Sequence, residues 1–139
     1  MSQIDKISEL KDSPEVINIR KKELNKLGYR DFEEWATSNV NHLYIGRNMN
    51  YYVRGTYKSK WHNPFSVKKY GLQKSLELFE EYISKNIDLM NNLHELDGKI
   101  LGCWCKPEQC HGDILIKLWR KFAELNKNKV IEFDSDTEW

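Results

Sequence analysis

The chain has 139 residues, of which 40% are hydrophobic, and its 22 Lys and Arg nearly balance its 21 Asp and Glu. This length suits one domain with its own core, and the balanced charge argues against tight, sequence-independent binding to a long polyanion. No apolar run approaches the roughly 20 residues that span a bilayer, and the charged residues 1–11 do not resemble a signal peptide. An odd set of three Cys, crowded between positions 103 and 110, does not suit a secreted disulfide framework. We therefore expect no membrane segment and a cytoplasmic or other intracellular reducing compartment.

The first part of the chain predicts short helices and two strands. Apolar residues at every third position predict a helical arm over residues 1–13. The β-branched run at 15–20 favours a strand, although Ser13-Pro14 is also a typical helix start. A short helix ending at Gly28 follows, then a helix that begins with a capping box at 31–34, and a second strand over 42–46.

The second part predicts a long connection, two strong helices and a third strand. Residues 47–70 have no sustained period and indicate a hairpin or a long functional loop. An apolar stripe predicts a helix over 71–86, with a shorter helical piece to 96. A buried strand over 99–104 and a helix over 111–125 complete the domain, and the tail 126–139 is expected to form an edge strand or to fray.

Strands that alternate with helices indicate an α/β fold. The sequence predicts a small single-domain, Rossmann-like three-layer fold with a mainly parallel sheet over residues 14–125. In such folds ligands bind beyond the carboxyl ends of the strands. The strand 99–104 leads directly into the block Cys103-Trp-Cys105 and Cys110-His111, so we expect the site there.

Three interpretations of this block stay open. As a metal site, Cys103, Cys105, Cys110 and His111 offer the ligands of a tetrahedral zinc centre, although all four lie within nine residues. As a thiol or anion site, Cys110 at a helix N-terminus would have a lowered pKa, with His111 as its proton partner. In the third interpretation the cysteines have no chemical role and are buried as part of the core.

The thiol or anion interpretation is favoured, and it gives roles to neighbouring residues. Cys105, a further catalytic candidate, would share a face with Cys103 and face the crevice. The backbone N–H groups from Cys110 to Gly112 would bind a phosphate or carboxylate. Asp113 is a candidate catalytic acid and equally a residue that favours the helix start.

A basic and aromatic segment supplies the remaining candidates. Arg47, Lys60, Trp61 and Asn63 fall in or beside a run of aromatic and cationic side chains from Tyr51 to Phe65. Lys and Arg neutralise phosphate, and Trp or Tyr stacks on a planar base. The alternative is a loop whose aromatics cover the sheet.

Several blocks resemble the domain of unknown function 4326 family, in the family's order. They are Val16-Ile-Asn-Ile-Arg20-Lys, Leu43-Tyr-Ile-Gly-Arg47, Ser59-Lys-Trp-His-Asn-Pro-Phe65 and Leu101-Gly-Cys-Trp-Cys-Lys-Pro-Glu-Gln-Cys-His-Gly-Asp-Ile-Leu115. The resemblance transfers no activity, and it implies that these positions belong together.

These observations predict a domain that binds, and acts on, a nucleotide, nucleoside or related phosphorylated small molecule. Arg20, Arg47 and Lys60 would engage the anion and Trp61 the base or sugar, while Cys110 and His111 would do the chemistry. A hydrolase or transferase of nucleotide metabolism fits best among enzymes. The alternative is a non-enzymatic, zinc-stabilised module that binds nucleic acid or protein.

Overall fold

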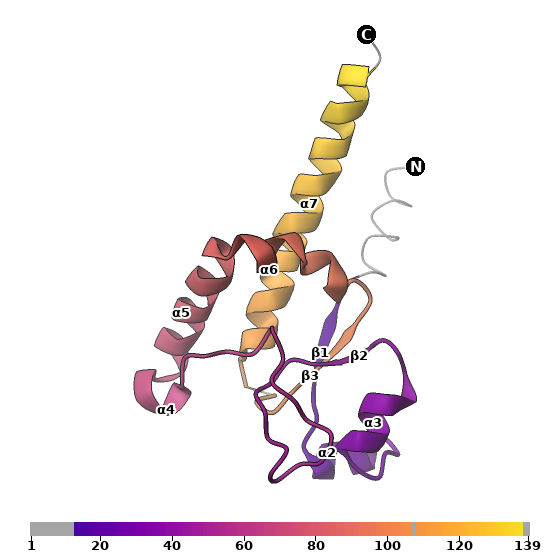
Figure 1. The fold of residues 1–139 in the computed structure, drawn as a ribbon, viewed down its shortest axis with the longest axis vertical. Helices are drawn as coiled ribbons and strands as arrows, with labels where there is room; N and C mark the ends of the chain where they lie inside the picture. The colour runs from indigo at the N-terminus through magenta and orange to yellow at the C-terminus, as the bar shows by residue number, and fades with distance from the viewer. Residues whose placement is uncertain (1–12, 107, 138–139) are drawn as a thin grey trace.

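The computed structural model describes residues 13–106 and 108–137, with side chains described to residue 125 (Figure 1). Its elements are β1 (Glu15–Asn18), α2 (Lys21–Lys26), α3 (Phe32–Ser38), β2 (His42–Tyr44), α4 (Val67–Tyr70), α5 (Leu72–Lys85), α6 (Ile87–Asn91), the 3-10 helix η1 (Leu93–Leu96), β3 (Ile100–Cys103) and α7 (His111–Thr137). The helical arm expected over residues 1–13 lies almost wholly outside the described residues.

The sheet is parallel, and the last strand in the sequence lies at its centre. Its order is β1-β3-β2, with Val16 opposite Leu101 and Leu43 also opposite Leu101. The β-branched run after Pro14 therefore forms a strand and not the alternative helix. The predicted α/β fold with a parallel sheet is confirmed.

Helices cover both faces of this sheet, which makes three layers (Figure 1). Alternate strand residues point to opposite faces. Leu101 and Cys103 of β3 join the core formed with α5, η1 and α7. Ile100 and Trp104 contact the smaller core formed with α2 and α3.

Gly102, between Leu101 and Cys103 in β3, lets α3 approach the sheet closely. A Cβ on Gly102 would lie 2.7 Å from the ring of Trp35 and 2.8 Å from a methyl group of Ile19. Trp35 is 1% exposed, so this contact has no room for a side chain. Close packing at the centre of the sheet thus depends on Gly102.

The long connection from β2 to α4 is an irregular loop. Residues 47–66, all within the described part of the chain, contain turns but no strand, so the hairpin interpretation is wrong and the long loop is confirmed. Short polar contacts hold the loop: the Ser59 N–H donates to the Gly46 carbonyl at 3.0 Å, and the Met49 N–H donates to the Thr56 hydroxyl at 3.0 Å. These contacts replace the ladder bonds that a hairpin would provide.

The C-terminal segment differs from its prediction. Helix α7 continues to Thr137, so no edge strand forms over these residues. No Gly or Pro follows Gly112 in the sequence, so nothing interrupts the helix once it has begun. Within the described residues, no helix has the length and apolar character that a membrane crossing requires.

Candidate functional site

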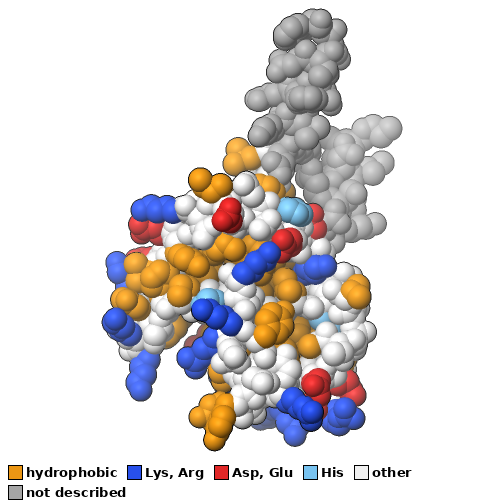
Figure 2. Space-filling model, viewed as in Figure 1, with side chains coloured by type: hydrophobic (Ala, Val, Ile, Leu, Met, Phe, Trp, Pro, Cys, Tyr) orange, Lys and Arg blue, Asp and Glu red, His pale blue; other side chains and the backbone are white. Residues whose placement is uncertain are grey.

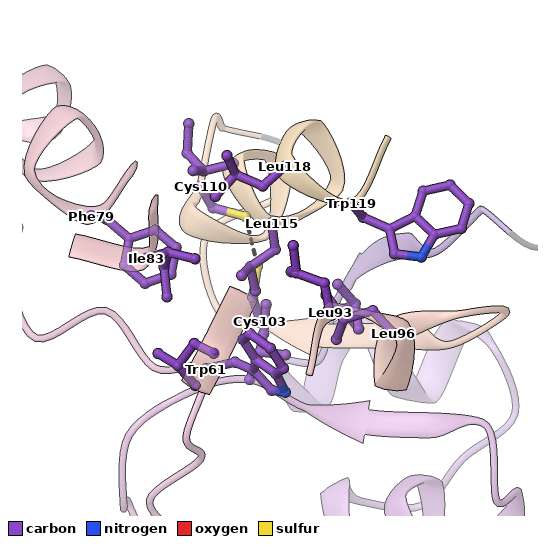
Figure 3. Packing of buried hydrophobic residues seen from close by; sticks show 14 of the residues in the cluster. Trp61, Phe79, Ile83, Leu93, Leu96, Cys103, Cys110, Leu115, Leu118 and Trp119 are labelled. Atoms are coloured by element: carbon purple, nitrogen blue, oxygen red, sulfur yellow. Dashed lines mark hydrogen bonds between the residues drawn. The ribbon is translucent and has the colours of Figure 1, made fainter. Parts of the chain in front are cut away.

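The Cys block lies at the carboxyl end of β3, as expected, but its three thiols lie in different environments. Cys103 and Cys110 are each 1% exposed, and their Sγ atoms are 3.2 Å apart (Figure 3). Cys105 is exposed. Trp104, between Cys103 and Cys105, packs toward the opposite face of the sheet, as strand geometry predicts.

The environment of Cys110 is the reverse of what its place before α7 suggested. The adjacent Cys103 thiol and burial together raise the pKa of the Cys110 thiol far above its ordinary value of 9.0. Desolvation and the neighbouring sulfur outweigh the helix N-terminus. The reactive thiolate predicted at Cys110 is therefore wrong, and the residue packs in the core.

Cys105 has the properties that the sequence assigned to Cys110. A hydrogen bond from the Cys103 thiol is the main cause that lowers the pKa of Cys105, and the positive charge of Arg20 adds to this effect. The same contact raises the pKa of Cys103. Because Cys105 is also exposed, it is the candidate nucleophile of the block.

His111 connects two elements and is not placed as a proton shuttle. It is 9% exposed, and its Nε2 lies 2.7 Å from the Ile45 carbonyl oxygen, just beyond β2. Its ring also meets the ring of Phe79 edge to face. Burial lowers the pKa of His111, so the neutral ring donates from Nε2 to this carbonyl.

The N-terminus of α7 is occupied by the chain's own carboxylate. Asp113 accepts a hydrogen bond from the Cys110 N–H at 3.0 Å and pairs with Lys106 Nζ at 2.6 Å. Gly112 is buried, and a Cβ there would lie 2.7 Å from a methyl group of Val16. The phosphate cradle predicted over 110–112 is therefore not available. Asp113 is a helix-start residue and Gly112 allows α7 to pack on the sheet.

Arg20 lies beside the block, as predicted. Its Nε donates to the Trp104 carbonyl at 3.0 Å, and its side chain is exposed. Asn18, at the end of β1, accepts a hydrogen bond from the Arg20 N–H at 2.8 Å and donates to the Lys106 carbonyl. The ends of β1 and β3 are thus joined by side chains, with the Arg20 guanidinium at their outer edge.

The remaining loop candidates do not gather at this edge. Trp61 is 1% exposed and packs in the larger core, where no ligand could stack on it (Figure 3). Asn63 donates to the Ser75 hydroxyl at 2.8 Å and accepts from the Phe65 N–H at 2.9 Å, so it shapes the loop. Lys60 pairs with Glu95 at 2.5 Å. Arg47 is exposed beyond β2, and its carbonyl accepts a hydrogen bond from the Tyr44 hydroxyl.

The sequence-predicted zinc set is not assembled. His111 Nε2 is engaged by a backbone carbonyl, and Cys105 is exposed while the other two thiols are buried. Among the residues that the structure describes, no group of three or more His, Cys, Asp or Glu side chains is arranged to hold a metal ion. The four predicted donors therefore do not fit a tetrahedral centre.

A cavity that the sequence did not indicate lies on the other face, against Trp104. Its volume is about 220 Å³, and it is lined by Ile19, Lys21, Asp31, Phe32, Tyr52, Val53, Arg54 and Trp104. Three of these side chains are aromatic and two are cationic. The lining residues come from the end of β1, the start of α3, the long loop and the end of β3, so the cavity lies at the carboxyl edge of the sheet.

The charges on the face that Figure 2 shows form no single basic stripe among the described residues. On the face in Figure 2, Lys and Arg side chains are spread around the body, with Asp and Glu among them. Arg54 itself lies 3.9 Å from Glu33. This distribution suits a small ligand bound in one place more than a long polyanion.

Comparisons with known proteins give a family but no activity. The family model described as "Domain of unknown function (DUF4326)" matches residues 30–121. "Uncharacterized protein R718" of Acanthamoeba polyphaga mimivirus is 38% identical over 87 residues, which is 56% of this chain and 66% of that protein, just under two thirds of its length. No solved structure matches the chain significantly.

Proposed function

We propose that this chain, which belongs to the DUF4326 family of unknown function, binds a nucleotide or a related phosphorylated small molecule. The site alone supports the proposal, because the family supplies no activity. The observation that carries the proposal is the cavity at the carboxyl edge of the sheet, which combines aromatic walls with cationic side chains. Ligands of parallel α/β sheets bind at this edge.

The shape of the cavity suits one planar ring system. Its volume of about 220 Å³ is below the ~300–1,000 Å³ of pockets that enclose drug-sized ligands, so a whole nucleotide would extend out of it. Phe32 and Trp104 form apolar walls, with ring centroids 6.3 Å apart. Tyr52 is 80% exposed and can close over a bound base.

The cations suit a phosphate outside the cavity. Lys21 and Arg54 belong to its lining, and the exposed guanidinium of Arg20 lies one residue before Lys21. Asp31 is engaged as the cap of α3, where it accepts from the Glu34 N–H at 2.9 Å. Asp31 and Glu33, which lies 3.9 Å from Arg54, offset part of the positive charge. The three cations still outnumber these two carboxylates, so the cavity mouth favours an anion.

Within this proposal Cys105 is the candidate nucleophile of a hydrolase or transferase. Its thiol is the exposed one of the three but does not line the cavity. It lies instead near the positive charge of Arg20, where the part of the ligand that extends out of the cavity would lie. Cys110, His111 and Asp113 have packing or capping partners instead. The candidate nucleophile thus moves from Cys110, immediately before α7, to Cys105, just beyond β3.

Binding is tested by calorimetry and by amide chemical shifts with the four ribonucleoside monophosphates, ribose 5-phosphate and inorganic phosphate. Binding of at least one nucleotide, with shifts at residues that line the cavity, is expected. Tyr52→Ala and Arg54→Gln should each weaken it by about tenfold, as loss of one stacking or charged contact does.

The chain offers matched controls for both variants. Tyr51 is 91% exposed and does not line the cavity, although its ring meets the ring of Tyr52 edge to face with centroids 5.0 Å apart. Tyr51→Ala should therefore weaken binding much less than Tyr52→Ala. Arg120 is exposed on α7, so Arg120→Gln is the control for Arg54→Gln and should bind like the wild type. Equal weakening by Tyr51→Ala and Tyr52→Ala, or no binding of any compound by folded protein, would exclude the proposal.

A further inference from the structure

The three cysteines form a series from solvent to core. Cys105 is exposed, whereas Cys103 and Cys110 are buried. The Cys103 Sγ lies 3.2 Å from the Cys110 Sγ (Figure 3). Cys105 follows Cys103 by two residues in the sequence, and the Cys103 thiol is the largest influence on the pKa of Cys105. Cys103 is therefore in contact with the buried Cys110 thiol and is the nearest of the two buried cysteines to Cys105 along the chain, so it stands between the exposed thiol and Cys110.

We propose that these thiols form an oxidation relay, in which Cys105 reacts with a low-molecular-weight disulfide and the oxidation passes inward to a Cys103–Cys110 disulfide. The inference rests on the placement of the three sulfurs and is independent of the cavity and its ligand. It assigns a role to the two buried cysteines, which the proposed nucleotide site leaves without one.

The first step joins the small molecule to the protein. The Cys105 thiolate attacks one sulfur of the disulfide RS–SR, so that a Cys105–SR bond forms and the original S–S bond breaks. The leaving thiolate RS⁻ takes up the proton that Cys105 released. One thiol RSH is produced, and Cys105 carries the second half of the small molecule.

Two exchanges then move the disulfide into the core. Cys103 attacks Cys105 Sγ, and the second RS⁻ leaves with the proton of Cys103. The Cys103 thiol, which is the main cause of the raised pKa of Cys110, is by then part of a disulfide and no longer exerts this effect. Cys110 then attacks Cys103 Sγ and releases Cys105, which regains a proton that balances the one lost by Cys110. Overall, two protein thiols are oxidised to one disulfide, and RS–SR is reduced to two RSH.

The properties of the three thiols favour this direction. A thiol with a low pKa is the better leaving group, and the pKa of Cys105 is lowered whereas those of Cys103 and Cys110 are raised. Exchange should therefore release Cys105 and retain the two buried sulfurs. Their 3.2 Å separation must shorten to about 2.05 Å, which is a small movement between neighbouring side chains.

The relay is tested on the intact chain with oxidised glutathione as the probe. Samples are quenched with acid over time, alkylated and mapped by peptide mass spectrometry. The wild type should first carry glutathione on Cys105 and then a Cys103–Cys110 disulfide without glutathione. Cys105→Ser should form that disulfide at least about tenfold more slowly, and Cys103→Ser should stop at the Cys105 adduct.

Two controls keep the result interpretable. Circular dichroism shows whether each variant folds; where Cys103→Ser does not, the order of species in the wild-type time course decides in its place. The same reaction in guanidinium should lose this order, because the folded arrangement is gone. Formation of the disulfide at an equal rate in the wild type and Cys105→Ser, or a wild-type adduct that never resolves, would overturn the relay.

Discussion

His111 Nε2 lies 2.7 Å from the carbonyl oxygen of Ile45, so the first residue of α7 is bound to the chain immediately after β2. The two residues are far apart in the sequence, yet this hydrogen bond is buried. It fixes the start of α7 over the same sheet edge to which the Cys block belongs. Four predictions follow from contacts at this edge.

Replacing His111 should cost stability and alter its pH dependence. His111→Ala leaves the Ile45 carbonyl without its donor, and we expect a loss of about 1–3 kcal/mol in the free energy of unfolding, measured with urea. Burial lowers the pKa of His111 from its ordinary 6.5, so below about pH 6.5 the unfolded chain binds a proton that the folded chain does not. Stability should therefore fall as the pH drops below 6.5.

The neutral variant His111→Gln isolates this effect from the other titrating groups. Its unfolding free energy should depend less on pH than that of the wild type between pH 7 and the lowered folded-state value. Parallel curves for the two proteins would contradict the buried, neutral histidine.

Gly112→Ala should destabilise the domain although alanine is the better helix former. The new Cβ would lie 2.7 Å from Val16 and 3.1 Å from Ile45, and such overpacking costs about 1–3 kcal/mol, against a propensity gain of about 1 kcal/mol. Chemical denaturation measures the net change. Ser84→Ala, at an exposed position of α5, is the control, and it should be neutral or slightly stabilising.

Asp113→Asn should weaken the start of α7. The Asp113 carboxylate pairs with Lys106 and accepts a hydrogen bond from the Cys110 N–H, and the variant loses its charge. Loss of such a contact lowers the free energy of unfolding by about 0.5–2 kcal/mol. Asp88 lies in the first turn of α6 and is exposed, which makes Asp88→Asn a control for loss of a first-turn carboxylate. Equal effects of the two substitutions on urea denaturation would argue against a special role for Asp113.

Alkylation should distinguish the three cysteines. In native protein, iodoacetamide should modify Cys105 readily, while the buried Cys103 and Cys110 react only after unfolding. Because the pKa of Cys105 is lowered from 9.0, its rate should reach half of its maximum below pH 9. Mass spectrometry of the modified peptides gives the measurement, and Cys105→Ser should lose the fast reaction.

The sequence predicted the elements well because their patterns are local. The β-branched run in β1 and the apolar stripe of α5 each lie within one window, and both elements formed where expected. Alternation along β3 also predicted that Trp104 would face away from Cys103. The end of α7 was missed because the tail was expected to form an edge strand or to fray, although no Gly or Pro there breaks a helix.

The site was harder to predict because its chemistry depends on contacts between distant segments. A helix N-terminus lowers a thiol pKa in isolation, but the sequence does not show that Cys103 and the core would enclose Cys110. Trp61 follows a basic run and suggested a stacking platform, yet it is buried. The cavity draws Phe32, Tyr52 and Trp104 from three separate segments, and no motif joins them.

The central place of β3 has a consequence for how the domain folds. Within the described residues, β1 and β2 each pair with β3 alone, and β3 begins 82 positions after β1 ends. Every pairing in the sheet therefore closes a long loop, and such topologies fold slowly. Until residues 100–103 take their place, β1 and β2 expose unpaired edges to other chains. Refolding yield should consequently fall as protein concentration rises, even though the finished sheet is covered on both faces.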